Sequence, residues 1–217
     1  MNIKHFTAQP FSYFKFEITL IIVFALSKFI LMDWLDMRAF YISGVCFFWL
    51  AYIYYRYRRD KSVMTAWGFS GSDLKKSIIK LLPFAMFSII SSVIYGTYTG
   101  TFINSWHILP ILGLYPIWGT FQQFIVVGLI VQNLSRFKTA TISKPFLVLI
   151  GALLFSLVHS PDIFLMTFTF FMEIIFIMVF LKYKNMWALG LTHGLVATFL
   201  LYFVEGRDLW AELFAWF

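Results

Sequence analysis

Long apolar stretches separated by short charged segments are the main pattern of the chain. A helix needs about 20 mainly apolar residues to cross the hydrocarbon core of a bilayer. The pattern predicts an all-α, polytopic integral membrane helix bundle of about seven spans. We place these spans near residues 17–35, 39–55, 78–96, 112–134, 145–160, 163–181 and 186–203. An eighth membrane segment forms if residues 102–112 or the C-terminal tail RDLWAELFAWF also insert.

The composition agrees with a membrane protein and leaves no stretch for a separate soluble domain. Of the 217 residues, 61% are hydrophobic and 12% are charged, and the mean hydropathy is +0.82. Soluble domains average roughly 45–50% apolar and about 25% charged residues. We therefore expect a single membrane domain over residues 1–217. The one cysteine, Cys46, excludes an intramolecular disulfide.

The charged residues of the predicted loops divide by sign. Basic residues fall on one side if the spans alternate: RYRRDK (56–61), Lys4, Lys75, Lys76, Arg136, Lys138, Lys144, Lys182 and Lys184. The opposite loops carry Asp33, Asp36, Asp162, Glu205 and Asp208. Cytoplasmic loops carry an excess of Lys and Arg. We therefore predict a bacterial plasma membrane protein with a cytoplasmic N-terminus and an extracytoplasmic C-terminus. The net charge of +7 then belongs to the loops, so we expect contact with membrane lipid and none with nucleic acid.

A few polar side chains stand inside the predicted spans. Polar groups in a bilayer must find partners because an unpaired one costs several kcal/mol. Ionisable residues there are candidates for function. The set is Gln122, Gln123 and Gln132 in the fourth span, His159 at the end of the fifth, Glu173 in the sixth and His193 in the seventh.

Glu173 is the most costly of these residues. It lies about ten residues, or roughly 15 Å, into its span, where an ionised carboxylate costs on the order of 2–4 kcal/mol. One interpretation is a structural hydrogen bond between helices, and the other is a site built from Glu173, His159 and His193. Two histidines and a glutamate also suit zinc. The chain has no HExxH motif, and we expect no metal and no cofactor.

Three segments of the C-terminal half resemble the motifs of one family in their order and separation. They are GTFQQFIVVG (119–128), FSLVH (155–159) and the stretch YKNMWALGLTHGLVA (183–197). They are similar to the EExxxR, FxxxH and HxxxN motifs of the intramembrane CPBP family. That family groups CAAX prenyl endopeptidases with bacteriocin-processing and self-immunity (Abi-like) proteins. The resemblance implies a motif-bearing core over residues 112–203, in which His159 and His193 take the positions of the motif histidines.

This chain departs from the family at the chemically important positions. Gln122 and Gln123 replace the paired glutamates, Val127 stands at the arginine position and Ala197 at the asparagine position. The family scheme implies that a carboxylate draws a proton from water, while histidine and asparagine stabilise the oxyanion. A glutamine amide cannot accept that proton, and Ala197 has nothing to donate.

Two functions remain open at this point. The first is a divergent glutamic-type endopeptidase that processes a hydrophobic, membrane-associated or C-terminal peptide. Glu173 then replaces the lost base, with His159 and His193 as its catalytic partners. The expected lining of the substrate cavity is Gln122, Gln123, Phe155, Trp187 and Ala197.

The second function is that of an inactive pseudo-protease. Such a protein binds a hydrophobic peptide, a prenyl chain or a partner helix without cutting it, in an immunity, chaperone or regulatory role. A small transporter or proton relay built on Glu173 and His193 is a third hypothesis, although no internal repeat is visible.

Overall fold

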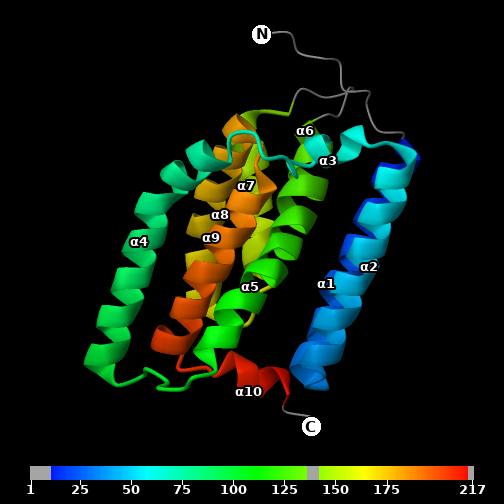
Figure 1. Ribbon diagram of the computed structural model, residues 1–217. Coiled ribbons are helices and arrows are strands. Elements are labelled where there is room, and N and C mark those ends of the chain that lie inside the picture. The colour runs from blue at the N-terminus through cyan, green and yellow to red at the C-terminus, as the bar shows by residue number, and fades with distance from the viewer. Residues whose placement is uncertain (1–10, 136–141, 215–217) are drawn as a thin grey trace.

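The computed structural model describes residues 11–135 and 142–214, and every regular element in them is helical. Figure 1 shows the long helices side by side in one bundle. The all-α prediction is confirmed. In chain order the elements are α1 (Phe11–Lys28), η1 (Phe29–Trp34), α2 (Arg38–Arg59), α3 (Ser62–Ala66), α4 (Leu74–Thr99), α5 (Ile108–Gln123), η2 (Phe124–Val131), α6 (Gln132–Ser135), α7 (Lys144–Leu157), α8 (Ile163–Tyr183), α9 (Met186–Phe199), η3 (Leu200–Val204) and α10 (Leu209–Leu213), where η marks a π-helical stretch.

The described residues contain fewer candidate membrane spans than the seven predicted. Four helical segments of the described chain are long and apolar enough to cross a bilayer, namely Leu74–Thr99, Ile108–Ser135, Ile163–Tyr183 and Met186–Val204. Helix α7 is apolar but shorter, with 14 residues. The predicted count of seven is not confirmed, and the two extra candidates do not form spans either. Residues 102–105 are irregular, and the described part of the C-terminal tail holds only the five-residue α10.

Helices α1 and α2 form a hairpin that runs along one side of the bundle (Figure 1). Their ranges cover the first two predicted spans, but both carry charge within the helix. Lys15, Glu17 and Lys28 lie in α1, and α2 begins at Arg38 and ends with three arginines in its last turns. These charges, together with the tyrosines of α2, lower the mean hydropathy of both helices below that of the four spanning segments.

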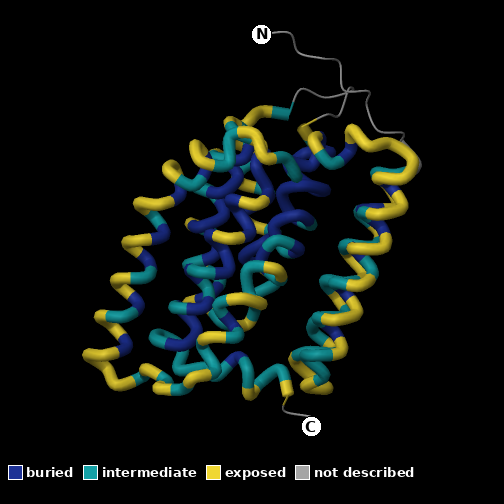
Figure 2. Tube along the Cα trace, viewed as in Figure 1, coloured by how far each residue is buried: buried dark blue, intermediate teal, exposed yellow. Residues whose placement is uncertain are grey.

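The centre of the bundle is a close contact between α5 and α9. A Cβ atom on Gly194 would lie 2.3 Å from the Cα atom of Pro116, and one on Gly190 would meet the side chain of Thr120. Small residues let two helix backbones approach in this way. Figure 2 shows that burial concentrates in these central helices, whereas α4 and the α1–α2 hairpin expose one face. The contact brings the residues of α5 next to His193.

The start of α9 is fixed by Asn185. Its side-chain oxygen accepts the N–H of Ala188 as a helix cap, and its amide donates to the carbonyl oxygens of Ser70 and Ser72 at 2.8 and 2.9 Å. The stretch around NMWALG therefore ties the loop before α4 to the first turn of α9. This is a structural reason for the asparagine in that stretch.

The charged loops lie at the two ends of the bundle. The end that holds α3 and α6 carries the basic loops, and the end that holds α10 carries the acidic ones (Figure 1). Lys4, Arg136 and Lys138 fall outside the described residues. Which end faces the cytoplasm remains a prediction.

Candidate functional site

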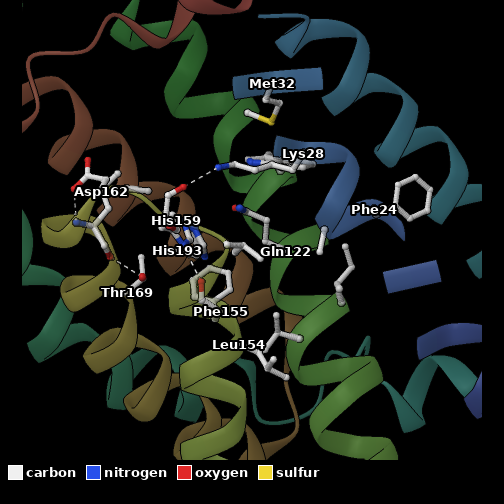
Figure 3. A pocket seen from close by; sticks show the side chains of 18 of the residues that line it. Phe24, Lys28, Met32, Gln122, Leu154, Phe155, His159, Asp162, Thr169 and His193 are labelled. Atoms are coloured by element: carbon white, nitrogen blue, oxygen red, sulfur yellow. Dashed lines mark hydrogen bonds between the residues drawn. The ribbon is translucent and has the colours of Figure 1, made fainter. Parts of the chain in front are cut away.

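A cavity of about 610 Å³ lies between the α1–α2 hairpin and the rest of the bundle. Its walls come from α1 and α2 on one side and from α5, η2, α7, α8 and α9 on the other. Most of the lining is aliphatic or aromatic, as at Ile21, Val126 and Leu154. Gln122, His159 and His193 bring polar groups into this apolar space, as Figure 3 shows.

The two adjacent glutamines face different surroundings. Successive residues of an α-helix point about 100° apart, so Gln122 and Gln123 cannot share one environment. Gln122 lines the cavity, and its buried Oε1 atom has no hydrogen-bond partner among the described residues. Gln123 is fully buried and points away from the cavity, toward α8 and α9.

Gln123 links the buried acid to one of the histidines. Its amide nitrogen donates to Oε2 of Glu173 at 2.8 Å and lies 3.1 Å from Nδ1 of His193. Glu173 is fully buried, and Gln123 is its only hydrogen-bond partner among the described residues. The acid, the amide and the imidazole thus form a three-membered chain that ends at the cavity wall.

The FxxxH segment positions both imidazoles. His159 lies in the turn after α7, and its Nδ1–H donates to the carbonyl oxygen of Phe155 at 2.8 Å. The Phe155 ring packs edge-on against both histidines, with centroids 5.0 Å from His159 and 5.5 Å from His193. One phenylalanine therefore supplies an acceptor for the first ring and an apolar support for both.

One end of the cavity carries charged side chains. Lys28 lines it, donating to Asp33 at 2.7 Å and reaching the Ser160 carbonyl oxygen at 3.5 Å (Figure 3). Arg207 also lines this end, and its paired hydrogen bonds to Glu212 raise the pKa of its guanidinium group. Lys28 lies inside the first predicted span, and only the fold shows that it enters the cavity.

The remaining predicted site residues divide between the cavity and other places. Ala197 and Phe155 line the cavity. Trp187 does not: its side chain is 49% exposed and its ring packs on Phe69, with centroids 5.1 Å apart. Glu173 and Gln123 lie behind the cavity wall, and no hydrogen bond joins Glu173 to His159. The direct convergence of one acid with two imidazoles is therefore replaced by a contact through Gln123.

No group of three His, Cys, Asp or Glu side chains in the described part of the chain could hold a metal ion. The two histidines of the cavity each use Nδ1 within the protein. What the arrangement offers is two further ring nitrogens, an amide and a lysine around an apolar space. These groups can bind a largely apolar molecule, and they can also exchange protons with a polar bond of that molecule.

A second buried polar cluster, centred on Glu17, was not predicted from the sequence. Glu17 is fully buried and accepts hydrogen bonds from Tyr52, from Arg56 at 2.8 Å and from Asn133. It joins α1, α2 and α6. Glu17 marks the start of the first predicted span, where an acid looks like a boundary residue, and only the fold brings its three partners together.

Comparison with known proteins gives one match. The family model described as type II CAAX prenyl endopeptidase Rce1-like matches residues 104–199, just under half of the chain. This segment contains both glutamines and both cavity histidines. The matched description concerns CAAX endopeptidases and lends no support to the Abi-like branch. No curated protein and no solved structure matches the chain significantly.

Proposed function

We propose that the protein is an intramembrane endopeptidase of the CPBP family, because residues 104–199 match the type II CAAX prenyl endopeptidase Rce1-like family model. Its substrate is a hydrophobic or membrane-anchored peptide, cleaved near its carboxyl end. The apolar cavity takes the lipid-like part of such a substrate, and the imidazoles stand beside the bond that is hydrolysed.

One observation carries this proposal: the two cavity histidines have complementary proton roles. His159 donates from Nδ1 to the Phe155 carbonyl, so in the neutral ring Nε2 is unprotonated and can accept a proton. The Nδ1 atom of His193 faces the Gln123 amide N–H, so its hydrogen sits on Nε2. A base and a donor on one cavity are the two groups that amide hydrolysis needs.

The reaction then proceeds through this chain's own side chains. His159 Nε2 takes a proton from water, and the water oxygen attacks the carbonyl carbon of the peptide bond. The carbonyl oxygen becomes an oxyanion that accepts a hydrogen bond from His193 Nε2–H. The C–N bond breaks as the proton on His159 passes to the leaving nitrogen, which releases an amine and a carboxylic acid.

Gln122 has a place in this scheme despite its lack of basicity. Its side chain lines the cavity, and its buried Oε1 atom has no partner among the described residues. An amide oxygen can accept a hydrogen bond, and we assign the attacking water to this acceptor once the amide turns toward the cavity. In this assignment Glu173 is not the base, because it lies behind Gln123 and does not line the cavity.

Substitution of the histidines tests the proposal. We expect purified protein in lipid nanodiscs to release the last residues of a peptide that carries a prenylated cysteine near its carboxyl terminus. His159→Ala should lower kcat by about 10²–10⁴-fold, the usual contribution of a general base. His107→Ala is the matched control, since His107 pairs with Asp208 outside the cavity and its loss should leave kcat unchanged. Equal activity of His159→Ala and wild type, with both proteins folded, would refute the assignment.

A second candidate, binding without cleavage, is favoured by one specific observation. No carboxylate occupies the positions of Gln122, Gln123 or Ala197, while the 610 Å³ cavity remains. This candidate predicts that the same prenylated peptide binds saturably and is recovered intact. Loss of the peptide's prenyl group should then weaken binding, and His159→Ala should leave binding unchanged.

A further inference from the structure

Glu173 is a buried acid that the proposed reaction does not use. It is fully buried on α8 and does not line the cavity, yet it is two hydrogen bonds from a ring that does. A fully buried carboxyl group with one hydrogen bond is costly to keep. Its second oxygen, Oε1, has no partner among the described residues. Such a group calls for a functional explanation.

The two hydrogens on the Gln123 amide nitrogen determine which ring nitrogen of His193 is protonated. A glutamine amide nitrogen carries two hydrogens and no acceptor. One hydrogen is directed at Glu173 Oε2 and the other at His193 Nδ1, so both partners must accept. A neutral imidazole carries one hydrogen. The hydrogen of His193 is therefore on Nε2, the nitrogen left for the cavity.

The opposite orientation of the same amide has the opposite result. If the Gln123 side chain turns by half a rotation, its oxygen faces both neighbours, and an oxygen needs donors. His193 would then donate from Nδ1 and present an unprotonated Nε2 to the cavity. In the first orientation Oε2 of Glu173 accepts the amide N–H, as observed. In the second orientation Glu173 would have to turn a protonated oxygen toward Gln123 to avoid an oxygen–oxygen contact, so the observed contact favours the first orientation.

We propose that Glu173 is a positioning residue that acts through Gln123 to keep the hydrogen of His193 on Nε2. This rests on the proposed function, in which that hydrogen faces the oxyanion. The acid controls a hydrogen bond in the cavity without entering it. Gln123 and Glu173 are both 0% exposed, so water does not replace either partner.

The inference makes a directional prediction for two variants. Glu173→Gln replaces a carboxyl group that accepts from Gln123 by an amide that can offer either its oxygen or its N–H, so both orientations of Gln123 become available and His193 should populate both tautomers. Gln123→Glu combined with Glu173→Gln places a carboxylate directly at Nδ1 of His193. The carboxylate requires a donor, so the hydrogen should move to Nδ1.

The tautomer can be measured directly. The chain has four histidines, so ¹⁵N-histidine labelling gives a sparse NMR spectrum, and the His193 signals are those lost in His193→Gln. ¹⁵N shifts separate protonated from unprotonated ring nitrogens. Thr198→Val is the matched control: Thr198 is buried on the same helix and bonds only its own helix, at the Gly194 carbonyl, so this variant should keep the wild-type spectrum.

Activity provides the second readout. Loss of the Nε2–H donor should lower kcat about tenfold or more, as for other oxyanion donors. KM should change little because the cavity lining stays the same. If Glu173→Gln fails to fold, the double variant and Gln123→Leu test the same hydrogen bonds through changes at position 123. Gln123→Leu should also give a mixture of the two His193 tautomers.

The outcomes separate the two proposals. A wild-type His193 with its hydrogen on Nδ1, or an unchanged tautomer in the Glu173→Gln and double variants, overturns the positioning role. The spectrum does not depend on turnover, so a protein that binds peptide without cleaving it can still show the predicted tautomers. In that event the proposed function fails and the positioning role stands.

Discussion

Gln122 and Gln123 occupy adjacent positions in the chain but belong to different parts of the molecule. Gln122 presents an amide to the cavity, and Gln123 is a buried link between Glu173 and His193. Both replace a glutamate of the family motif. The first replacement removes a base from the cavity, whereas the second leaves a hydrogen-bonding group where a neighbouring helix supplies the acid.

A substitution at Gln122 tests this division. Gln122→Glu places a group that can take up a proton beside the attacking water. We expect kcat to rise about tenfold at neutral pH, less than the roughly 10²–10⁴-fold of a full general base, because His159 already serves as one. Gln132→Glu is the matched control in the same long helix, because Gln132 accepts from Lys184 and does not line the cavity. Cleavage of the prenylated peptide measures both. A folded Gln122→Glu variant with no gain in activity argues against a water site at this position.

The sequence predicted some of the site residues but not their individual roles. The cost of burying polar groups singled out Gln122, Gln123, Glu173 and His193, and the structure puts the last three in one hydrogen-bonded chain. It did not separate the roles of the two glutamines, although their adjacency on a helix was a usable signal. Trp187 was expected in the cavity because it belongs to the motif stretch, yet its ring faces outward from that stretch and packs on Phe69.

At the scale of elements, the site depends on how closely α5 and α9 approach. The glycines on either side of His193 remove the side chains that would hold the helices apart, so Pro116 and Thr120 contact the α9 backbone. The distance between Gln123 and His193 follows from this packing. The positions of α7 and α8 matter in the same way, since α7 contributes Phe155, which contacts both histidines, and α8 contributes Glu173, which bonds Gln123.

The Gly194 contact gives a test of helix packing. Gly194→Ala places a methyl group about where the Pro116 backbone lies, and such overpacking costs roughly 1–3 kcal/mol. We expect a lower free energy of unfolding and at least a tenfold loss of activity, because His193 moves away from Gln123. The matched control is Gly113→Ala on α5, where no atom lies within 4 Å of the new Cβ. Thermal unfolding in detergent that ranks Gly113→Ala below Gly194→Ala would contradict the packing account.

Hydropathy located the helices well and the membrane spans less well. The predicted segments from 78–96 onward differ from the observed helices by a few residues at each end. The count failed at α1 and α2, because a pattern of apolar residues does not reveal whether the charges within it will be paired. Two of those charges have partners far away in the sequence, Glu17 with Arg56 and Asn133, and Arg38 with Glu212.

On the scale of the whole molecule, the four apolar helices and the family match identify an integral membrane protein. The α1–α2 hairpin closes one side of the cavity and is joined to the rest by polar contacts near both ends. Asn133 of α6 bonds Glu17 of the hairpin, and Arg38 bonds Glu212 of α10 at 2.6 Å. Between them the hairpin faces the cavity with apolar side chains.

The buried ion pair of the hairpin can be tested by its stability effect. Arg56→Met leaves Glu17 buried without its cation, and removal of one partner of such a pair costs about 3–5 kcal/mol. Replacement of both, Glu17→Leu with Arg56→Met, should cost less because no uncompensated charge remains. Arg58→Met on the exposed side of α2 should lie within about 0.5 kcal/mol of wild type. Chemical unfolding in detergent gives the order, and a double variant less stable than the single one would contradict this account.

Hydrolysis itself is the central claim, and one measurement addresses it most directly. Wild-type protein in nanodiscs is incubated in ¹⁸O-labelled water with a peptide that carries a prenylated cysteine near its carboxyl end, and the products are weighed by mass spectrometry. The account predicts a shortened peptide whose new carboxyl group contains oxygen from the labelled water. Recovery of the bound peptide at its full, unlabelled mass would contradict it and leave a cavity that binds without cleaving.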